Sequence, residues 1–190
     1  MPWVAHKTNK MKRFEINGVK REELGKTFSK LNRVNSQVPC VIYGGKENIH
    51  LLLNEIEVEK LINSPVVYTV VIKIGEISYD TIIKDIQFNP VTDRPMHIDF
   101  LELADDKKVS LKLPVQLVGV PEGVREGGKL ISKMRKLKIS AFPKDIPEVL
   151  TIDIDKLKVG DSVKIESLSF PGVTLLDAKN AVVCAVRITR

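Results

Sequence analysis

Apolar and polar residues alternate along most of the chain, which is the pattern of β-strands that bury one face. In the first half this alternation predicts strands with two short helices between them. The predicted strands run over 11–18, 38–45, 66–74, 76–88 and 97–103, and the helices over part of 21–35 and over 55–62. We expect six strands in all, closed into a barrel, because closure removes exposed strand edges.

The second half has strand patterns and almost no helical periodicity. Residues 104–108 form a short polar break, which we interpret as a domain boundary. Beyond it, prolines separate the alternating runs. These runs cover 109–118, 129–142, 150–154, 162–165, 173–176 and 181–189. The sequence therefore predicts a mainly β protein: a flexible leader over 1–10, a six-stranded β-barrel domain with two short helices over 11–103, and an all-β domain over 104–190.

Composition is that of an ordinary globular protein, with 43% hydrophobic and 28% charged residues among 190. No apolar run approaches the roughly 20 residues that span a bilayer, and the first residues lack the apolar core of a secretory signal. Cys40 and Cys184 lie in apolar strand patterns, which favours reduced, buried thiols in the cytoplasm over a disulfide. We expect no membrane partner.

The net charge of +6 is unevenly distributed. Residues 1–46 hold ten Lys and Arg against three Glu, 47–103 hold four basic against ten acidic residues, and 104–190 hold sixteen against eleven. A basic face opposite an acidic one suits a protein that lies on a polyanion with one side. A solvated surface with chance clustering explains the charge alone equally well.

No residue set indicates catalysis, a metal or a cofactor. The segment 123–129 has most of the P-loop spacing, but Leu130 stands where the magnesium-binding hydroxyl is needed, and the following residues lack a helical pattern. The three histidines have no metal-ligand spacing, and no serine lies in a G-x-S-x-G elbow. We therefore predict a non-enzymatic protein without a small-molecule substrate.

Polar and aromatic side chains on two predicted strands point instead to RNA. Tyr43 lies on one strand, and His97 and Asp99 share a face of another, where they can hydrogen-bond each other or reach ribose hydroxyls and base edges. Basic residues at helical spacing beside the apolar stripe of Phe28, Leu31 and Val34 suit phosphates. They are Lys26, Lys30 and Arg33. Core packing explains Tyr43 equally well, and solvation is the alternative for each charge.

A second basic segment, 129–138, carries Lys133, Arg135, Lys136 and Lys138 on one predicted strand. Lysines discourage edge-to-edge pairing, so this strand could be an edge guarded by charge. We favour docking of part of this surface on RNA or a neighbouring protein.

Several short segments carry a family resemblance. They are Gly25-Lys26, Pro39 to Gly44, Asp85-Ile86-Gln87 with Pro90, and His97 to Phe100 in the first half, and Leu113-Pro114-Val115, Glu122-Gly123-Val124, Gly127-Gly128 and Ala181-Val182-Val183 in the second. In these the chain resembles, over about 11–190, the bacterial large-subunit ribosomal protein family that binds 5S ribosomal RNA, known in its two-domain form as general stress protein Ctc. The chain departs from the family pattern at 30–33, where arginines are often denser, and at Phe88, where a basic residue often stands.

The resemblance implies a cytoplasmic, structural protein of the large ribosomal subunit that binds 5S rRNA and stabilises the central protuberance. It implies backbone contacts by Arg21, Lys26, Lys30 and Arg33, and contacts to riboses and base edges by Tyr43, Gln87, His97 and Asp99. Further expected partners are 23S rRNA and neighbouring large-subunit proteins. Two alternatives stay open: an RNA-binding stress protein that acts off the ribosome, and a barrel like the anticodon-binding barrel of a tRNA synthetase.

Overall fold

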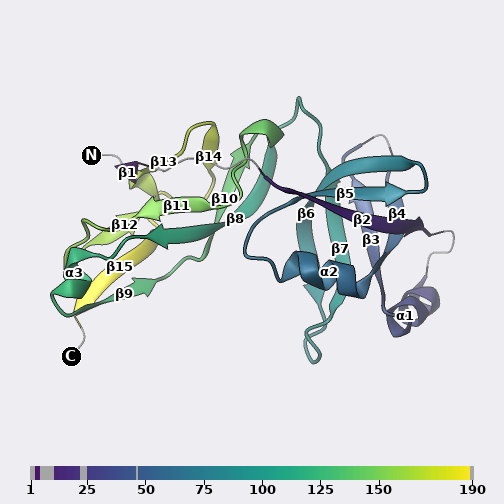
Figure 1. Ribbon diagram of the computed structural model, residues 1–190, viewed down its shortest axis with the longest axis horizontal. Coiled ribbons are helices and arrows are strands. Elements are labelled where there is room, and N and C mark those ends of the chain that lie inside the picture. Colours follow the sequence, from purple (N-terminus) through teal and green to yellow (C-terminus); the bar gives the residue numbers. More distant parts are fainter. Residues whose placement is uncertain (1–2, 5–10, 22–24, 46, 189–190) are drawn as a thin grey trace. The chain divides into compact units, whose positions relative to one another are not determined.

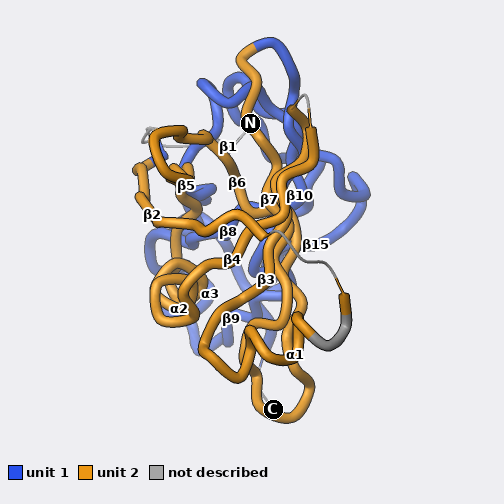
Figure 2. The backbone as a smooth tube through the Cα atoms, turned by 90° about the vertical axis from the view of Figure 1, so that its right-hand side faces the viewer, with its two compact units in different colours: residues 1–11, 106–190 blue, residues 12–105 orange. Residues whose placement is uncertain are grey.

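The computed structural model describes residues 3–4, 11–21, 25–45 and 47–188. The chain divides into two compact units, one of residues 12–105 and the other of residues 106–190 with 1–11 (Figure 2). The predicted domain limits, 11–103 and 104–190, lie close to this division and stay a prediction.

Two residues of the predicted leader, Trp3–Val4, form strand β1, which pairs in parallel with β13 (Leu168–Ser169). The sequence did not predict this pairing, because a polar composition does not reveal a distant strand partner; the flexibility of the leader stays a prediction. The rest of the predicted leader, 1–2 and 5–10, lies outside the described residues.

Six strands close into a barrel in the first unit, which confirms the predicted fold class (Figure 1). They are β2 (Arg13–Lys20), β3 (Gln37–Tyr43), β4 (Ile49–Asn54), β5 (Thr69–Ile74), β6 (Ile77–Phe88) and β7 (Pro95–Glu102). The order around the barrel is β2-β4-β3-β7-β6-β5, with parallel pairing of β2 with β5 and of β3 with β7. The sequence did not place β4, because three consecutive leucines at 51–53 hide its two-residue period.

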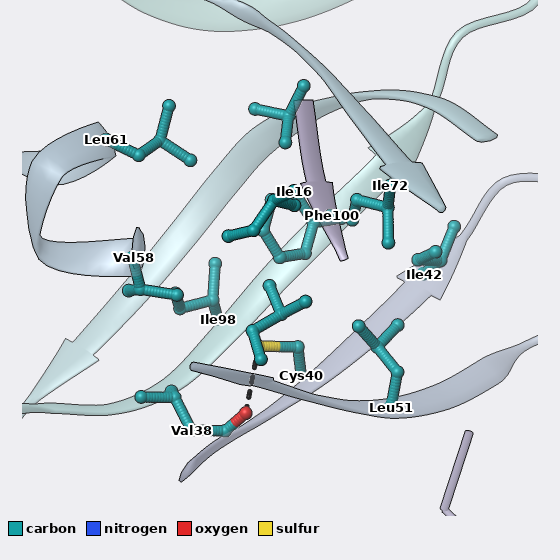
Figure 3. Close-up of a cluster of buried hydrophobic side chains, with 12 residues drawn as sticks. Ile16, Val38, Cys40, Ile42, Leu51, Val58, Leu61, Ile72, Ile98 and Phe100 are labelled. Atoms are coloured by element: carbon teal, nitrogen blue, oxygen red, sulfur yellow. Dashed lines mark hydrogen bonds between the residues drawn. The ribbon is translucent and has the colours of Figure 1, made fainter. Parts of the chain in front are cut away.

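The barrel interior is filled by branched and aromatic side chains (Figure 3). Fully buried members include Ile42, Leu51, Ile72, Ile98 and Phe100. They come from β3, β4, β5 and β7 at every second position, so the intervening residues of these strands point outward. The buried alternate positions thus determine which side chains form the outer face of the barrel.

The helix predicted over 55–62 is present with those bounds as α2 (Glu55–Ile62). The side chain of Asn54 accepts a hydrogen bond from the backbone N–H of Ile56 at 2.9 Å, which caps the first turn. Val58 and Leu61 are buried in the same cluster as the strand residues (Figure 3).

The other predicted helix is α1 (Lys26–Val34), which contacts β3. Its apolar stripe, Phe28, Leu31 and Val34, is 43%, 55% and 75% exposed. An amphipathic surface helix normally buries such a stripe. In the described residues it is only lightly covered, so α1 is held to the barrel by other contacts.

The second unit consists of two open sheets beside the short β1–β13 pair, as expected for an all-β region. One sheet has the order β11-β8-β10-β14 and the other the order β12-β15-β9. Their strands are β8 (Val109–Val118), β9 (Gly128–Ser132), β10 (Lys136–Ala141), β11 (Leu150–Asp153), β12 (Ser162–Lys164), β14 (Val173–Leu175) and β15 (Val182–Ile188). Short helical turns also occur, at α3 (Glu122–Arg125), η1 (Pro143–Asp145) and η2 (Ile165–Ser167).

The prediction of one strand over 129–142 is wrong. The backbone N–H groups of Lys133 and Met134 both donate to the carbonyl of Val183, and the chain bends there. Residues before the bend pair with β15 as β9, and residues after it pair with β8 and β14 as β10. Apolar residues alternate only in the second half of this run, at 137, 139 and 141, and such a local pattern cannot show that the chain changes sheets.

The glycines of the P-loop-like segment allow close packing of the backbone. A Cβ atom on Gly123 would lie 2.5 Å from the backbone nitrogen of Val159, and one on Gly128 would lie 2.6 Å from the carbonyl oxygen of Gly123. Gly127 has a φ of +97°, which favours glycine. These constraints account for the glycines without a bound phosphate.

Candidate nucleic-acid interface

The barrel topology brings the RNA-facing strands predicted from sequence side by side. β7 lies between β3 and β6, and residues opposite each other on paired strands point to the same face. Gln87 of β6 lies opposite His97 of β7. On the other side of β7, Tyr43 of β3 lies opposite Leu101, two residues beyond Asp99. Tyr43, Gln87, His97 and Asp99 therefore share one outer face.

His97 and Asp99 form an ion pair or hydrogen bond along β7. The distance from His97 Nδ1 to Asp99 Oδ1 is 2.9 Å, and the side chains are 29% and 33% exposed. A proton on Nδ1, donated to Asp99, leaves Nε2 of a neutral imidazole as an acceptor for an outside hydroxyl. The second carboxylate oxygen of Asp99 is a further acceptor. The pair thus presents fixed acceptors on a half-buried surface.

Tyr43 is half-buried beside these acidic groups. Burial is the main cause that raises the pKa of its phenol, and the negative charges of Asp99 and Asp85 raise it further. The phenol is therefore neutral at physiological pH, and its hydroxyl can both donate and accept a hydrogen bond. Its ring offers a flat surface of the kind on which RNA bases and riboses pack.

Arg33 attaches α1 to the same strand that carries His97 and Asp99. Its Nε donates to the carbonyl oxygen of Met96 at 3.2 Å. The side chain is half-buried. Arg33 and Met96 are 63 positions apart in the sequence. The hydrogen bond thereby holds the positive guanidinium group of Arg33 close to the His97–Asp99 pair.

The other predicted phosphate contacts differ in their structural roles. Arg21 is half-buried, and its Nη2 donates to Ser29 Oγ at 3.3 Å, which connects the end of β2 to α1. Lys30 is exposed on α1. The backbone of Lys26 begins α1, whereas its side chain lies outside the described residues. Among the described side chains, Lys30 is thus the most accessible of the predicted phosphate contacts.

Sequence reasoning missed two polar residues on this face. Asp85 lies opposite Asp99 on β6, and His50 of β4 lies opposite Val41, which itself lies opposite Asp99. The alternation of Asp85 with Gln87 was a signal for the first. His50 could not be placed because β4 was not recognised.

Cys40 and Cys184 are free and buried, as the apolar patterns predicted. Burial raises the pKa of the Cys40 thiol far above its ordinary value, and it also raises the pKa of Cys184. Both therefore remain protonated thiols at neutral and mildly alkaline pH.

We expect iodoacetamide at pH 8 to modify neither cysteine of the native protein within the time that it modifies free cysteine completely. Because the thiolate is the reactive form and both thiols are buried, two modifications per chain should appear only after denaturation in guanidinium chloride. Mass spectrometry counts them. Rapid modification of the native chain would contradict the burial described here.

The described residues contain no group of three potential metal-ligating side chains. None of the helices over the same ranges is long and apolar enough to cross a membrane.

Both units of the chain match family models of ribosomal proteins. Residues 16–100 match the model of the ribosomal L25p family, and residues 108–190 match that of the C-terminal domain of ribosomal protein TL5. The chain is 47% identical over 182 residues to large ribosomal subunit protein bL25 of Porphyromonas gingivalis, with 95% of each chain covered. It is 44% identical over 181 residues to the bL25 protein of Azobacteroides pseudotrichonymphae, with 95% of this chain and 96% of the relative covered.

Proposed function

The chain belongs to the bL25 family of large ribosomal subunit proteins, and we propose that it binds 5S rRNA through the outer face of its barrel and stabilises the central protuberance. As a member of this family it is a structural, non-enzymatic protein of the cytoplasmic ribosome, as the sequence predicted. Family membership places the protein in the large subunit, and the identity of the bound RNA as 5S rRNA is what we propose.

The observation that carries the proposal is the His97–Asp99 pair on the outer face of β7. A carboxylate on a surface that binds a polyanion weakens binding by electrostatic repulsion, unless the carboxylate accepts specific hydrogen bonds from the ligand. Ribose 2′-hydroxyls and exocyclic amines are donors that only a closely fitted RNA supplies. The pair therefore favours recognition of an RNA groove over general attraction to phosphate.

The basic residues around this pair would orient the RNA. Lys30 is exposed on α1, and Arg33 fixes α1 to β7 beside His97. Phosphate contacts of this kind position a protein and carry little sequence information. Tyr43 and Gln87 lie on the adjacent strands at the same face and would meet riboses and base edges.

The direct test is binding of the full chain to 5S rRNA and to an unrelated structured RNA of the same length at 150 mM salt. We expect the chain to bind 5S rRNA at least about a thousandfold more tightly than the unrelated RNA, which is the low end of the usual ratio of specific to non-specific affinity. Equal affinity for the two RNAs would contradict the proposal and leave only general attraction to polyanions.

Lys30→Ala should reduce the salt dependence of 5S rRNA binding. If Lys30 neutralises one phosphate, the slope of log affinity against log salt should become shallower by about 0.7–0.9. Filter binding at several salt concentrations measures this slope. Lys60→Ala, which removes an exposed lysine from α2, is the matched control and should leave the slope unchanged. If the two variants have equal slopes of log affinity against log salt, Lys30 does not contact a phosphate of the RNA.

A further inference from the structure

The outward face of the β8–β10 sheet carries three lysines. Lys112 of β8 and Lys136 and Lys138 of β10 are exposed. Their chain neighbours on the opposite face include Leu111, Leu113, Leu137 and Ile139, which are at most 6% exposed. The alternation therefore fixes the three lysines on one side of the sheet, because the other side is needed for the core.

Two of these lysines lie directly opposite each other. The register of the antiparallel pair places Lys138 against Lys112, and Lys136 is the next outward residue of β10. Like charges directly opposite on one face destabilise a sheet. None of the three makes an ion pair with a carboxylate among the described residues. The carboxylate of Asp177 contacts the main chain here: its Oδ2 accepts the backbone N–H of Lys138 at 2.7 Å.

Protection of a free strand edge does not explain Lys138. At Lys138 the main chain is occupied on both sides: it pairs with Lys112 of β8, its N–H donates to Asp177, and its carbonyl accepts from Leu176 at 2.9 Å. A lysine that guards an edge is useful where backbone groups are unpaired. At Lys138 those groups are paired, so edge protection does not account for its charge.

We infer that this face, which we term the β8–β10 lysine face, binds the phosphate backbone of rRNA in the large subunit, apart from the 5S rRNA contact of the barrel. Three neighbouring ammonium groups without acidic partners suit consecutive phosphates, which would relieve the repulsion between Lys112 and Lys138. Lys133 and Arg135, exposed in the connection before β10, extend the charge. The inference rests on the proposed function only in placing the protein on the ribosome.

Lys138→Glu separates RNA binding from folding, because the two should change in opposite directions. A glutamate opposite Lys112 replaces repulsion with attraction, so the melting temperature of the free protein should rise. Binding to large subunits from a strain that lacks this protein should weaken. In pelleting assays at several salt concentrations, the slope of log affinity against log salt should fall by about 0.7–0.9 for each lost phosphate contact.

The matched control is Lys164→Glu, the same charge change at an exposed lysine of β12 in the other sheet. Subunit binding as tight as that of this control, or a lowered melting temperature, would overturn the inference. Weaker subunit binding with an unchanged slope would point to a protein partner and overturn the assignment to RNA.

Binding to isolated 5S rRNA should be the same for Lys138→Glu and the wild type. An equal loss on isolated 5S rRNA and on subunits would also overturn the inference, since the face would then not be a separate contact. Failure of the wild type to bind 5S rRNA selectively would instead contradict the proposed function. The comparison on subunits would still decide the role of the lysine face.

Discussion

Asp99→Asn is expected to weaken 5S rRNA binding about tenfold or more, although it makes the protein more positive. The carboxylate of Asp99 accepts from His97 Nδ1 at 2.9 Å and has a second oxygen for an RNA hydroxyl. Hydrogen bonds that involve a charged group contribute about 1.5–3 kcal/mol, and 1.4 kcal/mol corresponds to tenfold in affinity. Filter binding at moderate salt measures the change.

The sign of this effect distinguishes specific contacts from bulk charge. Asp80→Asn removes the same charge at an exposed position of β6 and should leave binding unchanged or slightly tighter. Because the charge of Asp99 also raises the pKa of the Tyr43 phenol, that pKa should fall in Asp99→Asn, which verifies the local geometry. Tight binding by Asp99→Asn would mean that Asp99 is an ordinary surface charge.

Phe100→Ala should lower the free energy of unfolding by about 3–5 kcal/mol. Phe100 is completely buried in the barrel interior, where Ile16, Ile72 and Ile98 belong to the same cluster (Figure 3). Truncation removes apolar area and leaves a cavity that a closed barrel cannot easily collapse. Urea denaturation of the wild type and the variant measures the difference.

Leu101→Ala is the matched control, because the next residue of β7 is half-buried and points to the other face. Its loss of stability should be clearly smaller. Equal losses for the two variants would mean that residue 100 is not the interior position, and the register of β7 would then be wrong.

Much of the fold could be predicted because its signals are local. Alternation of apolar residues identified five of the barrel strands, and the pattern before Pro65 identified α2 with its bounds. The position of His97 and Asp99 on one strand face follows from their separation by two residues, so the strand period alone allows the hydrogen bond that the two side chains form.

What the sequence by itself determined was therefore which side chains share a face within one strand or helix, since that depends on a period of two or 3.6 residues. The tertiary structure alone decided which strands are neighbours. It placed Gln87 beside His97 and Arg33 on the carbonyl of Met96, and it divided 129–142 between two sheets. The physical reason is that strand pairing depends on backbone hydrogen bonds, which every residue except proline can donate as well as accept. Side-chain pattern therefore marks a strand and its buried face, whereas the packing of the whole chain selects its partners.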